Sequence, residues 1–195
     1  TDADGPIDYD EFGVYTQLQK KFLEDDRLKF TASLRYDKAQ NFDGNFSPRV
    51  SFAYAGGEDK NQNFRASFQT GFRNPTTQDQ YIGLDVGNAI LVGGVEENMD
   101  RYSTTFTDSS DGMSYTLTGR DAYENSYTVS SGGTVKANVD FVKPEKVTAY
   151  ELGYRSLLNA GQQLVTVDLS VYYNQYEDFI ANTNVIVPYN TTGGF

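Results

Sequence analysis

The sequence has no cysteine, no histidine and no tryptophan among its 195 residues. Without cysteine and histidine it lacks a thiol nucleophile, an imidazole base and the usual zinc ligands. It cannot form a disulfide framework either, so cysteine usage indicates no cellular compartment. Catalysis is left to carboxylate, lysine, tyrosine or serine side chains, and no recognisable arrangement of these occurs. We therefore expect a protein that is not an enzyme and that carries no cofactor.

Two further absences concern nucleic acid and membrane helices. The net charge is −11, whereas a protein that binds nucleic acid needs a cationic face for the phosphate backbone. No apolar run approaches the roughly 20 residues that a transmembrane helix needs. A transmembrane barrel is still compatible with this sequence, because its strands carry apolar residues only at every second position. The chain opens on TDADGPIDYDEF, which has neither the basic start nor the apolar stretch of a signal peptide.

What the sequence does contain is alternation of apolar and polar residues. Six segments show it, at 12–22, 28–36, 46–54, 63–73, 147–156 and 164–176. In the fourth segment, Phe64 and Phe68 fall on the opposite side of the strand from Arg65, because successive side chains of a strand face opposite ways. The pattern predicts an all-β protein with an antiparallel up-and-down meander.

The connections between these segments alternate in length. Those after the first, third and fifth segments are short, the second is longer, and the fourth runs from residue 74 to 146. A meander with this alternation has its short turns at one end and its long loops at the other, as outer-membrane barrels do. A soluble β-sandwich also alternates apolar and polar residues, so it stays open as an alternative.

Several short motifs resemble the barrel of TonB-dependent receptors from Gram-negative outer membranes. The family shows SPR at the start of a strand, GFR-x-P at the end of another, and L-x-PE leading to YELGYR after a long loop. GVYTQLQKKF (13–22) and VYYNQYEDFI (171–180) are similar to other strands of the family. The matching residues are Ser47, Pro48, Arg49, Gly71, Phe72, Arg73, Pro75, Val142, Pro144, Glu145, Tyr150, Glu151, Leu152, Gly153, Tyr154 and Arg155.

The resemblance implies a role in active uptake across the outer membrane. Members of the family have a barrel of about 22 strands that is filled by an N-terminal plug, and a short segment engages the energy-coupling protein TonB. We therefore expect residues 1–195 to be one partial transmembrane β-barrel domain, an interior piece of a longer receptor without plug or coupling segment. Its partners would be the rest of the barrel, the plug, TonB and outer-membrane lipid, and not nucleic acid. Its cargo would be a scarce solute, namely a siderophore, a cofactor, an oligosaccharide or a peptide.

Two functional alternatives remain at this point. A secreted or surface-anchored β-sandwich would use its acidic loop as a binding module. A hydrolase would use a pair of loop carboxylates, although the sequence defines no cleft for it.

The loop at 74–146 is the expected site of ligand recognition, because extracellular loops of this family meet the substrate. It holds eleven acidic residues against five basic ones. Its short alternating runs, at 115–117, 127–129 and 135–141, predict hairpins above the membrane. The motif residues Pro48, Arg49, Arg73, Pro75, Pro144, Glu145, Glu151 and Arg155 are expected to be structural. The candidate ligand-binding residues are Asp79, Tyr81, Asp85, Tyr102, Tyr115, Tyr123 and Tyr127.

A calcium site is a further candidate at the start of the chain. Asp2, Asp4 and Glu11 follow the later part of an EF-hand loop, which supplies oxygen ligands to the ion. Pro6 follows the loop glycine, and the sequence from Phe12 onward predicts a strand where an EF-hand has a helix. An acidic loop without metal is therefore the favoured interpretation.

Overall fold

The computed structural model describes residues 7–189. Contacts divide the chain into two compact units. The sheet unit comprises Tyr9–Asn74 and Pro144–Phe179. The loop unit comprises Pro75–Lys143 with the described residues 7–8 and 180–189. None of the helices in residues 7–189 is long and apolar enough to span a membrane.

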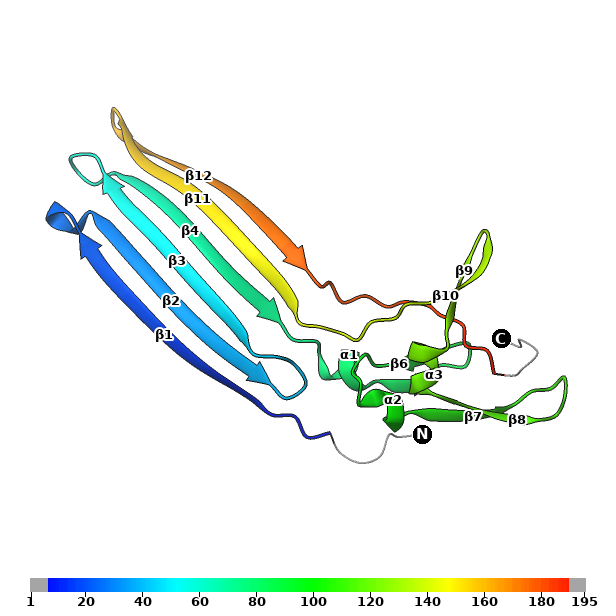
Figure 1. The fold of residues 1–195 in the computed structure, drawn as a ribbon. Helices are drawn as coiled ribbons and strands as arrows, with labels where there is room; N and C mark the ends of the chain where they lie inside the picture. Colours follow the sequence, from blue (N-terminus) through cyan, green and yellow to red (C-terminus); the bar gives the residue numbers. More distant parts are fainter. Residues whose placement is uncertain (1–6, 190–195) are drawn as a thin grey trace. The chain divides into compact units, whose positions relative to one another are not determined.

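The sheet unit is one antiparallel sheet in which β4 and β11 are adjacent although the loop unit separates them in sequence (Figure 1). The strand order is β1-β2-β3-β4-β11-β12, so the sheet is a meander apart from this insertion. The predicted all-β antiparallel meander of about six wall strands is confirmed. The strands are β1 (Glu11–Phe22), β2 (Leu28–Ala39), β3 (Asn45–Gly56), β4 (Gln62–Arg73), β11 (Glu145–Ala160) and β12 (Gln163–Glu177).

The two ends of the sheet differ in their connections. At the turn end, β1 and β2 are joined through the short helix η1 (Glu24–Asp26), and β11 and β12 through a tight turn at Gly161, whose φ is +66°. At the loop end, β4 stops at Arg73 and β11 begins at Glu145. The fifth and sixth alternating segments predict strands at 147–156 and 164–176. The β11–β12 hairpin extends further toward its turn, because Leu157 pairs with Thr166 and the ladder runs to Ala160. The polar residues of this hairpin resemble a turn, and Gly161 has the positive φ that closes it, a conformation that glycine adopts without strain.

The register of the ladders places apolar residues on one face across all six strands. Phe68 lies opposite both Val50 and Tyr150, and Leu152 lies opposite both Ala66 and Val171. We call the side that carries these residues the apolar face, and the side that carries Arg65, Ser67, Gln69, Glu151 and Asp168 the polar face.

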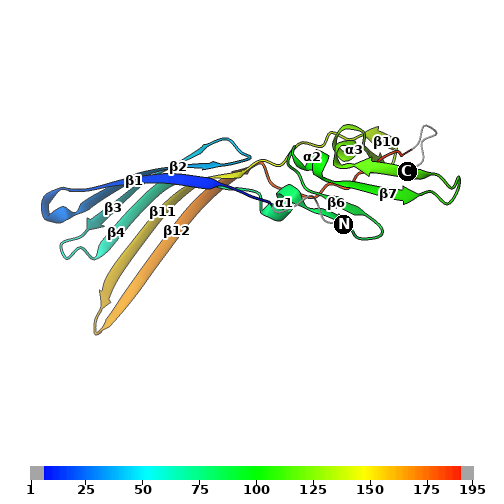
Figure 2. The same cartoon turned by 90° about the horizontal axis from the view of Figure 1, so that it is seen from below.

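The apolar face is exposed in this unit. Leu152 is 63 % exposed and Val171 is 70 % exposed, and the described residues of the sheet unit form no second sheet. A sandwich buries such a face between two sheets, so the sandwich alternative is not the fold of this unit. The sheet is curved rather than flat (Figure 2), as expected for a piece of barrel wall.

The loop unit contains three two-stranded hairpins and three short helices rather than an irregular loop. The hairpins at Tyr115 and Tyr127 lie where alternating runs predict them, whereas the first hairpin and the helices have no counterpart in that prediction. The elements are α1 (Thr77–Tyr81), β5 (Gly83–Asp85), β6 (Ile90–Val92), α2 (Asn98–Arg101), β7 (Ser103–Thr107), β8 (Ser114–Thr118), α3 (Gly119–Glu124), β9 (Tyr127–Ser130) and β10 (Gly133–Lys136).

A small core holds the loop unit together. The side chains of Tyr81, Val95, Met99 and Tyr102 are buried. Asn98, which is fully buried, donates from its amide nitrogen to two backbone oxygens, those of residues 82 (3.0 Å) and 93 (3.3 Å). A buried amide with such partners ties separate loops together, because leaving those carbonyls unpaired would be unfavourable.

Candidate functional site

The polar face of the sheet is hollowed into a groove of about 610 Å³. Half of its lining residues are serine, threonine and glutamine residues of β1 to β4. The charged residues that line it are Lys29, Arg35, Arg49, Arg65 and Glu151. Two of the four cations are paired with carboxylates, Arg35 with Asp37 and Arg65 with Glu151 and Asp168, which leaves Lys29 and Arg49 without an ion pair among the described residues.

Arg65 is the centre of an ion-pair network on this face. Its Nη2 lies 3.2 Å from Oδ1 of Asp168 and donates to Oγ of Ser170 at 2.7 Å. Its Nε lies 3.5 Å from Oε1 of Glu151. Nε of Arg155 approaches the other oxygen of Asp168 at 3.3 Å. One arginine of β4 therefore links β11 and β12 through side chains, in addition to the backbone ladder.

Gly153 makes this reach possible. It lies directly opposite Arg65 in the β4–β11 ladder, and a Cβ at this position would be 2.3 Å from Nε and 2.7 Å from Cγ of Arg65. The arginine therefore lies across the bare backbone of β11 to reach β12. The φ of Gly153 is not among the positive values, so the glycine is needed for space and not for backbone conformation.

The remaining motif residues mark where the chain leaves and rejoins the sheet. Arg73 and Glu145 are opposite each other in the ladder, and Nε of Arg73 lies 2.8 Å from Oε2 of Glu145. Pro144 directly precedes β11, and the carbonyl oxygen of Pro75 accepts from Nε2 of Gln80 at 2.7 Å. These contacts lie at the two ends of the inserted loop unit, and the structural role of the motif residues stays a prediction.

Asp79 lies in the first turn of α1 and stabilises the start of this helix. Asp79 Oδ2 accepts from the backbone N–H of Thr76 (2.9 Å) and from its hydroxyl (2.7 Å), while Thr76 Oγ1 accepts from the N–H of Asp79 (3.1 Å). This capping box satisfies amide groups at the start of α1. Asp121 forms the same arrangement with Thr118 at α3. The Asp79 carboxylate is thus engaged by its own helix.

Two candidate tyrosines, Tyr81 and Tyr102, belong to the core of the loop unit, and a third, Tyr123, is half-buried. Tyr81 is buried and its hydroxyl donates to Oε2 of Glu97 at 3.2 Å. Tyr102 is buried with its ring over Gly83, and burial raises its pKa. Tyr123 stacks on Phe141 at 5.0 Å between ring centroids, and burial raises its pKa as well. Rings packed in this way stabilise the fold of the loop unit rather than form an exposed binding surface.

Tyr115 is brought into a cluster that the sequence does not indicate. Its ring lies 6.1 Å from that of Phe106 and 5.1 Å from that of Tyr189. Its hydroxyl donates to Oδ2 of Asp111 at 2.5 Å, and this hydrogen bond raises the pKa of Tyr115 to about 12. Hydrogen bonds from the backbone N–H and hydroxyl of Ser110 lower the pKa of Asp108, and the Tyr189 hydroxyl, which donates to the same carboxylate, lowers it further. Two phenol–carboxylate pairs therefore sit beside one aromatic cluster.

The last two loop candidates lie apart from that cluster. Asp85 is exposed, and its carboxylate accepts from the backbone N–H of Gly87 at 2.7 Å. Tyr127 begins β9 and exchanges backbone hydrogen bonds with Ile186, both at 2.8 Å. The roles of all seven loop candidates in ligand binding stay predictions.

The calcium candidate falls mostly outside the described residues. Asp2 and Asp4 lie there, so only Glu11 can be placed. It begins β1, and its Oε1 accepts from the side-chain amide of Asn74 at 3.1 Å. Within residues 7–189 no group of three or more acidic, histidine or cysteine side chains could hold a metal ion.

Comparison with known proteins identifies one family. The sequence matches the family described as "TonB dependent receptor-like, beta-barrel" over residues 1–194. No curated protein and no solved structure matches the chain. Proteins of this family act in TonB-dependent transport at the outer membrane of Gram-negative bacteria, and they are in general transporters rather than enzymes.

Proposed function

Because this chain belongs to the TonB-dependent receptor β-barrel family, we propose that it forms wall and outer loops of an active outer-membrane importer. The importer takes up a scarce solute, which is a siderophore, a cofactor, an oligosaccharide or a peptide. Energy comes from TonB, and no residue of this chain performs covalent chemistry. The chain works in the outer membrane of a Gram-negative bacterium.

The observation that carries this proposal is the contrast between the two faces of one sheet. Leu152, Leu169 and Val171 are each more than half exposed on the apolar face, which is unfavourable in water over so large a surface. Arg65 and its partners cover the opposite face. In a membrane barrel the first face contacts hydrocarbon and the second lines an aqueous interior, so both are stable.

The two outer strands of the sheet support a role within a larger wall. In the described part of the chain, β1 and β12 each pair with a single neighbour. Unpaired strand edges are not stable in hydrocarbon, because no water satisfies their backbone groups. We propose that further strands of the same receptor pair with both edges, that its plug contacts the polar face, and that TonB engages a segment outside this sheet.

The charge of the groove bears on the class of solute. Lys29 and Arg49 line it and form no ion pair within the described residues. Such cations favour anionic groups on the plug or on the solute that passes. The loop unit is acidic, and its repulsion of anions acts at the outer surface, where salt screens it over about 8 Å at physiological ionic strength.

Membrane insertion tests the proposal directly. Leu152→Arg places a charge on the apolar face near mid-strand, which costs about 2–4 kcal/mol at the bilayer midplane. Ser67→Arg places the same side chain on the polar face beside Glu151, its partner in the ladder, and serves as the matched control. We expect Leu152→Arg to insert into lipid vesicles far less than Ser67→Arg. Equal insertion of the two, or a wild-type chain that is monodisperse without detergent, contradicts a lipid-facing role.

Transport itself is tested in cells. Uptake of labelled solutes from the four classes is measured with the protein present or deleted, in cells with functional TonB and in cells without it. We expect one class to enter only when both the protein and TonB are present. Uptake that is independent of TonB would rule out the energised importer.

A further inference from the structure

Three connections of the chain join the loop end of the sheet unit to the body of the loop unit. The first follows β4 after Arg73, the second precedes β11 at Glu145, and the third follows β12, which ends at Glu177. The third connection leads to residues 180–189, which belong to the loop unit although β11 and β12 separate them in sequence from residues 75–143. We call residues 180–189 the strap.

The first two connections lie side by side. β4 and β11 are adjacent, and Arg73 is opposite Glu145 where both strands reach the loop unit, with Nε 2.8 Å from Oε2. On the other side of β4, the ladder with β3 starts only at Arg49 opposite Gln69. Residues 70–73 of β4 therefore pair with β11 alone in the described part of the chain.

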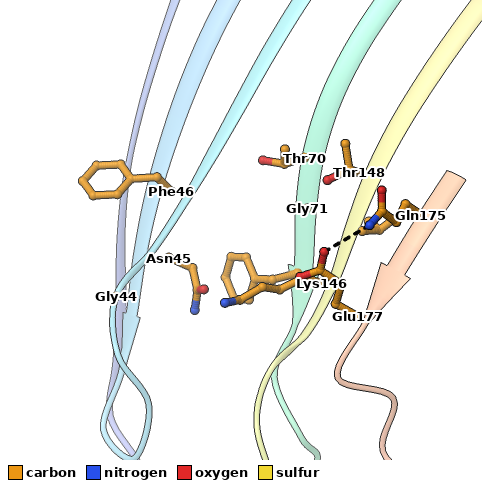
Figure 3. Close-up of a pocket in the computed structure, with 11 residues that line it drawn as sticks. Gly44, Asn45, Phe46, Thr70, Gly71, Lys146, Thr148, Gln175 and Glu177 are labelled. Carbon is orange, nitrogen blue, oxygen red and sulfur yellow. Dashed lines mark hydrogen bonds between the residues drawn. The ribbon is translucent and has the colours of Figure 1, made fainter.

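A hollow of about 350 Å³ lies beside these strand ends (Figure 3). Asn45 and Phe46 of β3 line it on one side, and Gly71 and Phe72 of β4 line it on the other. A strand end with a hollow beside it moves without breaking ladder bonds to a third strand. Hinges in proteins are formed by a few residues at the ends of such elements, so the paired ends of β4 and β11 are suited to act as a hinge for the loop unit.

The strap is attached to the rest of the loop unit at two points. Ile186 exchanges two backbone hydrogen bonds with Tyr127 of β9, each 2.8 Å long. The Tyr189 hydroxyl donates to Oδ2 of Asp108 at 2.9 Å, and the Tyr189 ring lies edge-on to that of Phe106 at 4.9 Å between centroids. The strap thus contacts both β9 and the β7–β8 hairpin.

These contacts are few compared with those of the hinge strands. The strap and β9 share a single bridge, and residues 185–189 are half-buried, whereas β4 and β11 form a ladder along the whole of β4. Segments with few buried contacts and exposed hydrogen bonds open locally at a low free energy, before the surrounding unit unfolds. The strap is therefore expected to detach while both units stay folded.

We propose that the strap is a releasable attachment that controls movement of the loop unit during transport. While the strap is in place, the loop unit is tied to the end of β12 as well as to the hinge, and it cannot turn about the hinge. When the Tyr189–Asp108 hydrogen bond and the Ile186–Tyr127 bridge open, the loop unit turns and a solute passes. The inference rests on the proposed function, because this movement regulates uptake only in an importer.

Hydrogen exchange of the full-length receptor in micelles tests whether the strap detaches separately. Tyr189→Phe removes the hydroxyl that donates to Asp108 and keeps the ring. We expect the amide of Ile186 to exchange about three- to tenfold faster in this variant, as loss of one hydrogen bond implies. The amide of Gly94, which is hydrogen-bonded in the core of the loop unit, should keep its rate. Tyr123→Phe is the matched control, because the hydroxyl it removes bonds to a backbone oxygen outside the strap.

A disulfide tests whether uptake requires release. The chain has no cysteine, so Tyr127→Cys combined with Ile186→Cys supplies one defined pair at the bridge. Directly paired strand residues have Cα atoms about 5.5 Å apart, a distance that a disulfide spans. The control, Thr105→Cys with Thr116→Cys, joins opposite residues of the β7–β8 ladder and leaves the strap free.

Uptake by cells is measured with labelled ferrichrome, cyanocobalamin, maltohexaose and trialanine, one probe from each solute class. We expect TonB-dependent uptake to be lost in the oxidised strap variant, to return after reduction with dithiothreitol, and to be unchanged in the control. The amides of residues 70–73 should exchange more slowly in the oxidised strap variant than in the oxidised control, because the hinge no longer moves.

The outcomes separate the two proposals. Unchanged exchange at Ile186 in Tyr189→Phe, or an equal rise at Gly94, shows that the strap does not detach separately and overturns the inference. Uptake by the oxidised strap variant at the rate of the control also overturns it, while the importer proposal stands. If no probe enters wild-type cells in a TonB-dependent way, the importer proposal loses its support, and exchange of residues 70–73 still decides whether the strap restrains the hinge.

Discussion

The contact between Gly153 and Arg65 gives the sharpest prediction. In Gly153→Val, the new side chain would occupy the space where Arg65 now crosses β11, because even a Cβ would lie 2.3 Å from its Nε. Arg65 must then lift away from Asp168 and Ser170, to which it is 3.2 Å and 2.7 Å distant. The substitution is therefore expected to break the side-chain link between β4 and β12 without touching either strand.

The size of the effect follows from the exposure of these groups. The side chains of Arg65 and Asp168 are 36 % and 38 % exposed, so each ion pair is worth only about 0.2–1 kcal/mol. With the hydrogen bond to Ser170 included, the displaced contacts amount to about 1–2 kcal/mol. Valine favours strands over glycine by up to about 1 kcal/mol, so the net loss in the wild-type background is about 1 kcal/mol or less.

A double-mutant cycle separates these two contributions. Gly153→Val, Arg65→Ala and the double variant are compared with wild type by urea unfolding in micelles, followed by the circular dichroism of the strands. In the Arg65→Ala background there is nothing to displace, so Gly153→Val is expected to become neutral or stabilising. The coupling free energy should be about 1–2 kcal/mol. A substitution that is equally destabilising in both backgrounds would show that the glycine serves the backbone, and the steric explanation would be refuted.

Two further predictions concern the loop unit. Asp111→Asn removes the carboxylate that accepts from the Tyr115 hydroxyl, so the pKa of Tyr115 should fall from about 12 toward its ordinary value near 10; ultraviolet titration of the phenols measures this. Because the pKa of Tyr115 is raised in the folded protein, the stabilisation by this hydrogen bond is fully present below about pH 10 and is lost as the pH approaches 12. A wild-type protein whose stability does not fall over this pH range contradicts the prediction. Asp79→Ala and Thr76→Ala should each destabilise α1 by about 1 kcal/mol, and the double variant by little more, as judged by limited proteolysis. If Asp79→Ala instead weakens solute binding and Thr76→Ala does not, the carboxylate acts in recognition.

The sheet was predictable because period-two alternation directly reports which face of a strand is buried or exposed to lipid. The side of Phe64 and that of Arg65 are fixed by sequence spacing alone. The path of Arg65 over Gly153 was not predictable, because it depends on which residues are opposite each other in a ladder between strands separated by the whole loop unit. Sequence patterns specify faces, whereas cross-strand partners depend on register.

The loop unit was predicted less well, for two physical reasons. Its helices are only four to six residues long, so they show no apolar periodicity. A signal was present nevertheless, since T-x-x-D at Thr76–Asp79 and again at Thr118–Asp121 is a capping box. The pairing of Asp108 with Tyr189 joins residues that are 81 positions apart. No local pattern predicts it, because it arises from tertiary packing.

The stretch YELGYR of β11 contributes residues to both the apolar face and the polar face of the sheet. Tyr150, Leu152 and Tyr154 project to the apolar face, while Glu151, Gly153 and Arg155 project to the polar face. Of these, Glu151 pairs with Arg65, and Gly153 leaves the space that Arg65 crosses. Inserting one residue would exchange the two sets, bringing charges to lipid and aromatic rings to water. The motif is therefore constrained on both sides of the sheet at once.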